Sequence, residues 1–283
     1  MLQQKASIQK TLLLFNRKFK MKPLIRGLAV SVISLCIIQT SYAQSLEEKG
    51  LAIAHEVENR DSGWQDMLVT LKMILRNKQG DESTRDIQQK VLEVSGDGDK
   101  SLTVFNKPRD IKGTAFLSFS HIVDPDDQWL YMPALKRVKR ISSSNKSGPF
   151  MGSQYAYEDL ASFEVGKYNY KYLRDEVLGA TDSFVIENIP LYEFSGYTRQ
   201  VVWIDKSRYI PLQIEYYDRK NELLKTASFI GYEQYLGRYW RANKQIMVNH
   251  QNGKTTELLL SDYQFKTGLS ARNFDKNSLK RIR

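Results

Sequence analysis

The sequence predicts a mainly β (α+β) fold, built on one curved antiparallel sheet, with helix only at its start and near residues 155–160. Two observations favour this fold: apolar and polar residues alternate along many short segments, and dipeptides typical of tight hairpins separate several of them. A third observation is that no strand-helix-strand rhythm and no repeat of fixed period runs along the sequence, which disfavours a doubly wound fold. A large antiparallel sheet must curl, so we expect a concave apolar face that is either packed solid or hollow.

The first element of the folded chain is predicted to be a helix that begins after Ser45. Ser45 is a favourable N-cap, and Glu48, three residues later, completes a capping box. Apolar or small residues then recur on one stripe at helical spacing, at Leu46, Gly50, Ile53 and Val57. One face of this helix should therefore dock on an apolar surface.

From Met67 the hydrophobic period changes to two, which indicates a strand with one dry side. The residues that share this side are Met67, Val69, Leu71, Met73 and Leu75. Similar alternation recurs at 102–104, 168–172 and 212–216, and hairpin turns are marked by Asp97-Gly98, Lys220-Asn221 and Asn252-Gly253. We expect roughly ten strands that follow one another as a meander.

Residues 1–43 are predicted to be a cleaved signal peptide, within which residues 1–20 are consistent with an upstream-start extension. Basic residues precede an apolar stretch at 28–38, and the small-x-small signal Ser41-Tyr42-Ala43 follows it. The stretch is shorter than the ~20 residues that span a bilayer, and Leu35 before Cys36 disfavours lipid attachment. We therefore expect residues 44–283 to be exported to the periplasm as one domain.

Cleavage changes the charge balance of the protein. The full chain has a net charge of +10, but residues 44–283 hold 35 Lys and Arg against 32 Asp and Glu, a net charge of +3. This small excess is weak evidence for nucleic-acid binding. Because Cys36 is the only cysteine, the exported domain must be stable without disulfides, which a chain of about 240 residues achieves by burying a large share of its surface.

Aromatic residues are dense between positions 129 and 172. Tyrosine rings, apolar with a polar end, suit a lipid pocket with a wet mouth, although strands favour aromatics in any case. Within this region the loop 142–153 is rich in serine and glycine and carries the isolated pair Phe150-Met151. This pair is either a gate over a cavity or a plug that packs into the core.

A basic run lies between Leu135 and Ile141. Arg137 and Lys139 would share a strand face with these two apolar residues, where they could meet anionic headgroups or an acidic partner surface. The alternative is a solvated edge strand that its charges protect from aggregation.

Catalytic motifs are poorly represented in the sequence, which lacks G-x-S-x-G, H-E-x-x-H, paired cysteines and a complete dinucleotide loop. Ser120 and His121 are the one nucleophile and base that stand side by side, but neighbours on a strand point to opposite faces. The acidic residues around Pro125 are more typical of a solvated turn than of a calcium site. We therefore predict a protein that is not an enzyme and needs no cofactor and no metal.

Two segments, KGTAFLSFSH (112–121) and DDQWLYMPALKRVKRISSSNKSGPFMGSQYAYEDL (126–160), resemble the family of outer-membrane lipoprotein-sorting proteins, relatives of the periplasmic lipoprotein carrier LolA. The resemblance implies a LolA-like fold, in which an incomplete barrel has helices lidding its concave face and an apolar cavity for acyl chains. It also implies association with RND-type transporters of the envelope.

We therefore expect a periplasmic carrier that binds a lipid or lipoprotein acyl chain and moves it between the inner and outer membranes, with transient membrane-surface contact and no nucleic-acid partner. The competing hypotheses are a non-carrier accessory subunit of an RND-type transporter and, less directly indicated, a lipid hydrolase centred on His121. The residues predicted for the cavity wall, lid and mouth are Trp129, Tyr131, Leu135, Phe150, Met151, Tyr155 and Tyr157, with Arg137 and Lys139 at the mouth.

Overall fold

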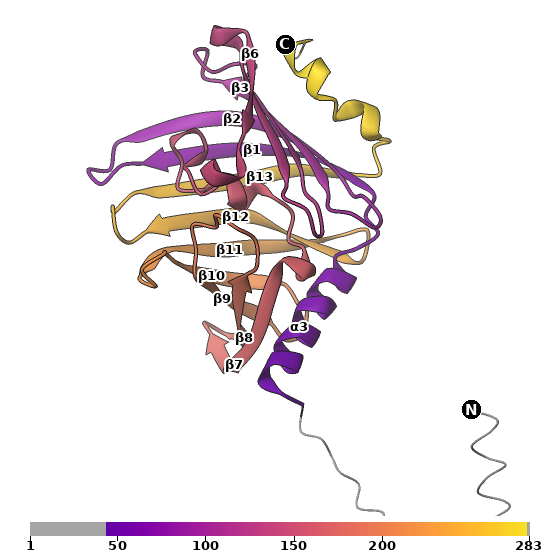
Figure 1. Ribbon diagram of the computed structural model, residues 1–283, viewed down its shortest axis with the longest axis vertical. Helices are drawn as coiled ribbons and strands as arrows, with labels where there is room; N and C mark the ends of the chain where they lie inside the picture. The colour runs from indigo at the N-terminus through magenta and orange to yellow at the C-terminus, as the bar shows by residue number, and fades with distance from the viewer. Residues whose placement is uncertain (1–43, 282–283) are drawn as a thin grey trace, which may run out of the picture. The chain divides into compact units, whose positions relative to one another are not determined.

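The computed structural model describes residues 44–281, and the predicted signal peptide, residues 1–43, lies outside the described residues. In this part of the chain thirteen strands form one sheet in the order β6-β5-β4-β3-β2-β1-β13-β12-β11-β10-β9-β8-β7 (Figure 1). The strands are β1 (Asp66–Arg76), β2 (Glu82–Leu92), β3 (Lys100–Lys107), β4 (Ala115–Phe119), β5 (Asp127–Met132), β6 (Arg137–Ile141), β7 (Tyr168–Leu178), β8 (Thr181–Pro190), β9 (Arg199–Asp205), β10 (Pro211–Tyr217), β11 (Leu223–Tyr235), β12 (Tyr239–Asn249) and β13 (Thr255–Phe265).

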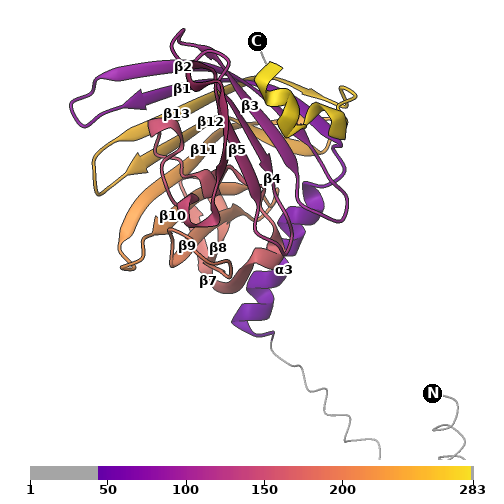
Figure 2. The same ribbon diagram turned by 45° about the horizontal axis from the view of Figure 1, so that its top comes forward.

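The sheet consists of two meanders joined by the antiparallel pairing of β1 with β13. All other neighbours are consecutive in the chain, and β6 and β7 form the two edges, so the curved sheet stays unclosed (Figures 1 and 2). The predicted mainly β, curved antiparallel fold is confirmed. The strand count exceeds the expected ten partly because β4 and β9 are buried almost throughout, so that no alternation marks them in the sequence.

Both faces of the sheet carry buried side chains. We define the inner face as the one that meets the helix α3 (Leu46–Arg60) and residues 142–167. On the opposite, outer face, Phe274 and Leu279 of the C-terminal turns η6 (Ala271–Asn273) and η7 (Lys276–Arg281) pack in one cluster with Leu117 of β4. Among residues 44–281, no helix is both long enough and apolar enough to cross a membrane.

The helix α3 begins as its sequence predicts. The Ser45 hydroxyl accepts a hydrogen bond from the Glu48 amide at 3.0 Å, and the Ser45 amide donates to the Glu48 carboxylate at 2.9 Å, which completes the capping box. Leu46, by contrast, is 48% exposed, so its predicted place on the buried stripe is wrong. As the first residue of the helix, Leu46 precedes the turns that reach the sheet.

The buried stripe of α3 packs on β7 through Gly50. A Cβ atom at Gly50 would lie 2.8 Å from the Tyr172 amide nitrogen, closer than real Cβ contacts come. Only glycine therefore lets the two backbones approach this closely. The same face buries Ile53 and Ala54 against Ile186 and Val202 of the inner face.

Residues 142–167, which we call the inner segment, connect β6 to β7 and pass across the inner face as short 3₁₀ turns (Figure 1). These turns are η2 (Ser143–Asn145), η3 (Phe150–Gly152), η4 (Tyr157–Leu160) and η5 (Val165–Lys167), so the helix expected near 155–160 is a single 3₁₀ turn. Phe150 is 1% exposed, and its ring centroid lies 5.1 Å from that of Phe116 and 5.5 Å from that of Tyr157. The structure thus places Phe150 as a plug.

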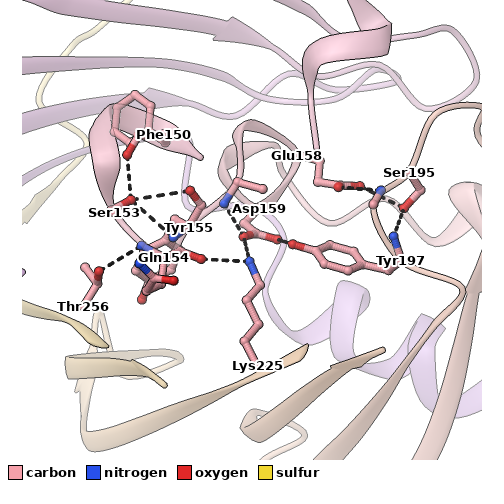
Figure 3. Close-up of polar contacts among 12 residues, drawn as sticks. Phe150, Ser153, Gln154, Tyr155, Glu158, Asp159, Ser195, Tyr197, Lys225 and Thr256 are labelled. Carbon is pink, nitrogen blue, oxygen red and sulfur yellow. Dashed lines mark hydrogen bonds and ion pairs between the residues drawn. The ribbon is translucent and has the colours of Figure 1, made fainter. Parts of the chain in front are cut away.

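Polar contacts fix the inner segment to the sheet, as Figure 3 shows. Asp159 forms a buried ion pair with Lys225 of β11 at 2.5 Å and accepts a hydrogen bond from the Tyr197 hydroxyl at 2.8 Å. The Gln154 amide donates to the Thr256 hydroxyl of β13 at 2.9 Å. These contacts come from three separate places on the sheet and its loops, so this part of the inner segment is held on several sides.

Candidate functional site

A cavity of about 1260 Å³ lies where α3, the inner segment and the inner face leave space between them. Its apolar wall combines Val57 of α3 with Ile186 of β8, Val202 of β9 and Ile214 of β10, and the end of the inner segment adds Phe163. The turn between β2 and β3, residues 93–99, forms the opposite side. These strands supply apolar side chains because alternate residues of each strand point to the inner face.

A second cavity of about 820 Å³ adjoins the C-terminal end of α3. It shares Val57, Asp61, Phe229 and Arg241 with the larger cavity, so the two spaces meet around the last turn of the helix. Arg241 forms an ion pair with Asp61 at 2.5 Å at this boundary. The end of α3 therefore lies between the two hollows.

The charged side chains that line the larger cavity are mostly acidic. Seven carboxylates face one guanidinium, that of Arg241, and the acids are Glu58, Asp61, Asp66, Glu93, Asp97, Asp99 and Glu164. Negative charges in a partly desolvated space repel one another and repel anionic ligands.

The pKa values of three of these acids are raised, chiefly by burial. Burial, together with the neighbouring charges of Glu164, Glu93 and Asp61, raises the pKa of Asp99 to about 7. Burial also raises the pKa values of Glu164 and Asp61. These three acids, which we call the rim of the cavity, therefore favour the protonated form more than exposed carboxylic acids do.

Ser162 ties the inner segment to the turn on the far side of the cavity. Its hydroxyl accepts a hydrogen bond from the Asp99 amide at 3.2 Å and donates to the Glu164 carboxylate at 2.6 Å, while its amide donates to the Ser120 hydroxyl at 2.9 Å. This single serine therefore links two of the acids of the rim and closes one side of the cavity.

Two amide side chains interrupt the apolar wall. Asn188 of β8 and Gln200 of β9 are direct partners in the strand pairing, line the cavity and are 2% and 8% exposed. The Oδ1 atom of Asn188 has no hydrogen-bond partner among the described residues. Buried polar atoms are nearly always hydrogen-bonded, so an acceptor left free beside a hollow is a notable feature of this wall.

The structure places the predicted wall residues elsewhere. Phe150, Met151, Tyr155 and Tyr157 belong to the main core cluster of the inner face or pack against it, and none of the four lines the larger cavity. Their side chains fill the main core cluster of the inner face, while the hollow lies beside α3. Leu160 and Phe163, farther along the same segment, line the cavity instead.

The other predicted residues lie outside the inner face. Trp129 and Tyr131 belong to the outer-face cluster with Phe274 and Leu279, because alternation on β5 turns Leu130 inward and its two neighbours outward. Neither residue lines the larger cavity.

The basic run lies on the edge strand β6 or just before it. Leu135 is 64% exposed, Arg137 and Lys139 are exposed, and none of the three borders the cavity. The structure agrees with the alternative of a charged, solvated edge. The larger cavity is instead bordered by acids, of which the sequence analysis named only Asp97, as part of a hairpin turn.

Ser120 and His121 do not form a nucleophile–base pair. The Nδ1 atom of His121 lies 2.8 Å from the Asp97 carboxylate, whereas the Ser120 hydroxyl is engaged by the Ser162 amide. Among the described residues, no group of three or more His, Cys, Asp or Glu side chains is arranged to hold a metal ion.

Comparisons with known proteins agree with this architecture. A family model that matches residues 97–281 describes its members only as uncharacterized proteins. A solved structure of an outer membrane lipoprotein-sorting protein domain from Vibrio parahaemolyticus is 60% identical, with a TM-score of 0.82, over 83% of this chain and 100% of that domain.

Two more distant structures are also similar. A DUF1329 family protein from Desulfovibrio piger is 29% identical, with a TM-score of 0.79, over 83% of this chain and 99% of its own. A LolA superfamily protein from Nitrosomonas europaea is 22% identical, with a TM-score of 0.65, over 81% of this chain and 98% of its own, a likeness of fold. Among curated proteins, none matches this chain.

Proposed function

The chain belongs to the LolA-like family of outer-membrane lipoprotein-sorting proteins, and from this membership we propose that it is a non-enzymatic carrier that buries a hydrocarbon chain beside α3. The single observation that supports this proposal most is the hollow of about 1260 Å³ between the apolar inner face and the helix. Pockets for small molecules commonly measure roughly 300–1,000 Å³, so this space suits a larger ligand.

The driving force for loading would be burial of methylene groups. Each methylene moved from water into an apolar site is stabilised by about 0.8 kcal/mol, so a long acyl chain gains enough to leave water without a covalent step. Release then requires a partner that buries the chain equally well. The carrier itself needs only a hollow that opens and closes.

We propose the periplasm as the place of transfer and a lipid or lipoprotein acyl chain as the cargo, moved between the inner and outer membranes. The proposal draws on the signal-like sequence of residues 1–43 and on the relative from Vibrio parahaemolyticus, which is described as a lipoprotein-sorting domain. An RND-type transporter is the proposed partner at the inner membrane.

A cavity-filling variant tests the carrier proposal. Ile214 of β10 lines the cavity, so Ile214→Trp should fill part of the hollow and reduce uptake of a fluorescent fatty alcohol by about 10-fold or more. Gln213→Trp is the matched control, because the preceding residue of the strand points to the other face and should leave uptake unchanged. Equal uptake by both variants would count against the cavity as the binding site.

The second candidate function is an accessory subunit that carries nothing. The exposed basic side chains of Arg137 and Lys139 on the edge strand β6 favour it, since they present a docking surface away from the cavity. Such a subunit would take up no lipid, and reversing both charges to Glu would release its transporter in a pull-down from envelope extract. A carrier docked elsewhere would keep both its partner and its lipid.

A further inference from the structure

The orphaned acceptor of Asn188 carries information about the cargo. Two buried side-chain atoms among the described residues have no hydrogen-bond partner, Oδ1 of Asn188 and Oε1 of Gln128, and of these two residues only Asn188 lines the cavity. A buried polar atom without a partner destabilises the fold, so this arrangement is expected where a bound molecule supplies the missing donor.

The neighbours of Asn188 on the sheet leave its Oδ1 atom unsatisfied. Tyr170, its partner on β7, donates its hydroxyl hydrogen bond to the Val165 carbonyl at 3.0 Å and is therefore engaged. Gln200, its partner on β9, is directly opposite and also lines the cavity, yet no hydrogen bond joins the two amides. Ile186 on the same face keeps the surroundings apolar.

The charges that line the cavity also favour a ligand that donates hydrogen bonds. Seven carboxylates line it, all of them acceptors when ionised, and the guanidinium of Arg241 is already paired with Asp61. A carboxylate or phosphate headgroup in this space would be repelled. A neutral group with a hydrogen to donate would find acceptors on the apolar wall and at the rim.

We propose that the cavity selects a hydrocarbon-chain cargo whose polar end carries an N–H or O–H donor and no negative charge, and that this donor binds Oδ1 of Asn188. The proposal rests on the carrier function proposed above and adds the chemistry of the cargo. An amide-linked acyl chain and an aliphatic alcohol both supply such a donor, and the experiment below separates them.

The test is a competition monitored by native mass spectrometry on the protein expressed from its full-length sequence. N-methylpalmitamide and methyl palmitate are nearly isosteric and differ in one N–H group, hexadecanol supplies an O–H donor, and palmitate supplies an anion. If the cargo gains one net hydrogen bond, the bound fraction of the amide, of the alcohol or of both should exceed that of the ester by roughly 3- to 10-fold. The bound fraction of palmitate should be the lowest. Whichever of the amide and the alcohol binds more strongly identifies the preferred donor, N–H or O–H.

Variants assign the preference to one atom. Asn188→Leu, with Asn188→Ala as a second variant of smaller volume, should retain the ester and reduce the donor preference to below about 2-fold. Gln128→Met removes the other orphaned acceptor, which lies outside the cavity, and should keep the preference unchanged.

The outcomes separate this inference from the carrier proposal. If the unmodified protein binds the ester as well as both donors, or if the preference survives both Asn188 variants, the cargo does not donate to Oδ1 and the inference is overturned. If the unmodified protein binds none of the four probes, the carrier function itself fails.

Discussion

Asp99 illustrates at the scale of a single residue how the cavity alters chemistry. Its pKa is raised from 3.8 to about 7, chiefly by burial. Because the folded protein holds this proton more tightly than the unfolded chain, ionisation of Asp99 destabilises the fold. The destabilisation is absent below pH 3.8, grows as the pH rises towards 7, and persists above it.

Asp99→Asn should therefore stabilise the protein more at alkaline than at acidic pH. The gain in the free energy of unfolding should be larger at pH 8 than at pH 4.5 by roughly 1–3 kcal/mol, measured by urea unfolding at both pH values. The variant keeps an oxygen that can accept the hydrogen bond from the Val94 amide. The comparison with the unmodified protein cancels the titration of the other acids.

A neighbouring acid supplies a control of opposite sign. The hydrogen bond from His121 lowers the pKa of Asp97, so ionised Asp97 stabilises the fold above the ordinary pKa of 3.8, and this stabilisation is lost as the pH falls through the lowered value. Asp97→Asn should therefore be more harmful at pH 8 than at acidic pH. The same sign of pH dependence in both variants would contradict this reading of Asp99.

At the scale of the element, the inner segment determines which half of the inner face is solid. Its Phe150 ring is packed against Phe105, with ring centroids 5.9 Å apart, and against Phe116 and Tyr157. The backbone carbonyl of Met151 accepts a hydrogen bond from Arg85 of β2. The segment is thus part of the core at this point, and the hollow begins only near Leu160.

Phe150→Ala should accordingly lower the free energy of unfolding by about 3–5 kcal/mol, as expected for removal of a buried phenylalanine. Leu135→Ala is the control, because Leu135 is 64% exposed and its removal should change stability by less than about 0.5 kcal/mol. Denaturant unfolding followed by tryptophan fluorescence measures both. A gate would give a small loss at Phe150, similar to that at Leu135.

The elements also show what sequence reasoning recovers. The capping box at Ser45 and Glu48 and the alternation along β1 are local patterns, and the structure confirms both. The hairpins at Asp97-Gly98, Lys220-Asn221 and Asn252-Gly253 join β2 to β3, β10 to β11 and β12 to β13, as predicted. Local turn chemistry and hydrophobic period thus determine most of the elements.

The site was harder to predict because it depends on contacts between distant segments. Asn188 and Gln200 become neighbours through the pairing of β8 with β9, and the rim brings Asp61, Asp99 and Glu164 together from α3's end, a hairpin and the inner segment. One signal was available: Asn188 and Gln200 are amides on the same face as the apolar Ile186 and Val202. An uncompensated polar residue on a buried face is a reason to expect a ligand.

At the scale of the whole molecule, the fold divides its inner face into a solid part under Phe150 and a hollow part beside α3. Gly50 holds the helix against β7, and the acids of the rim and the amide of Asn188 give the hollow its polarity. The outer face is covered by the C-terminal turns near β4 and β5 (Figure 2). The proposed carrier would thus combine a stable core with an open internal space.

Native mass spectrometry of the protein purified from a cell envelope extract tests the central claim most directly. The account predicts a bound species of added mass that is lost on denaturation, and uptake of a long-chain amide or alcohol by the emptied protein. A mass equal to that of the polypeptide alone, together with no uptake of any of these chains, would contradict it.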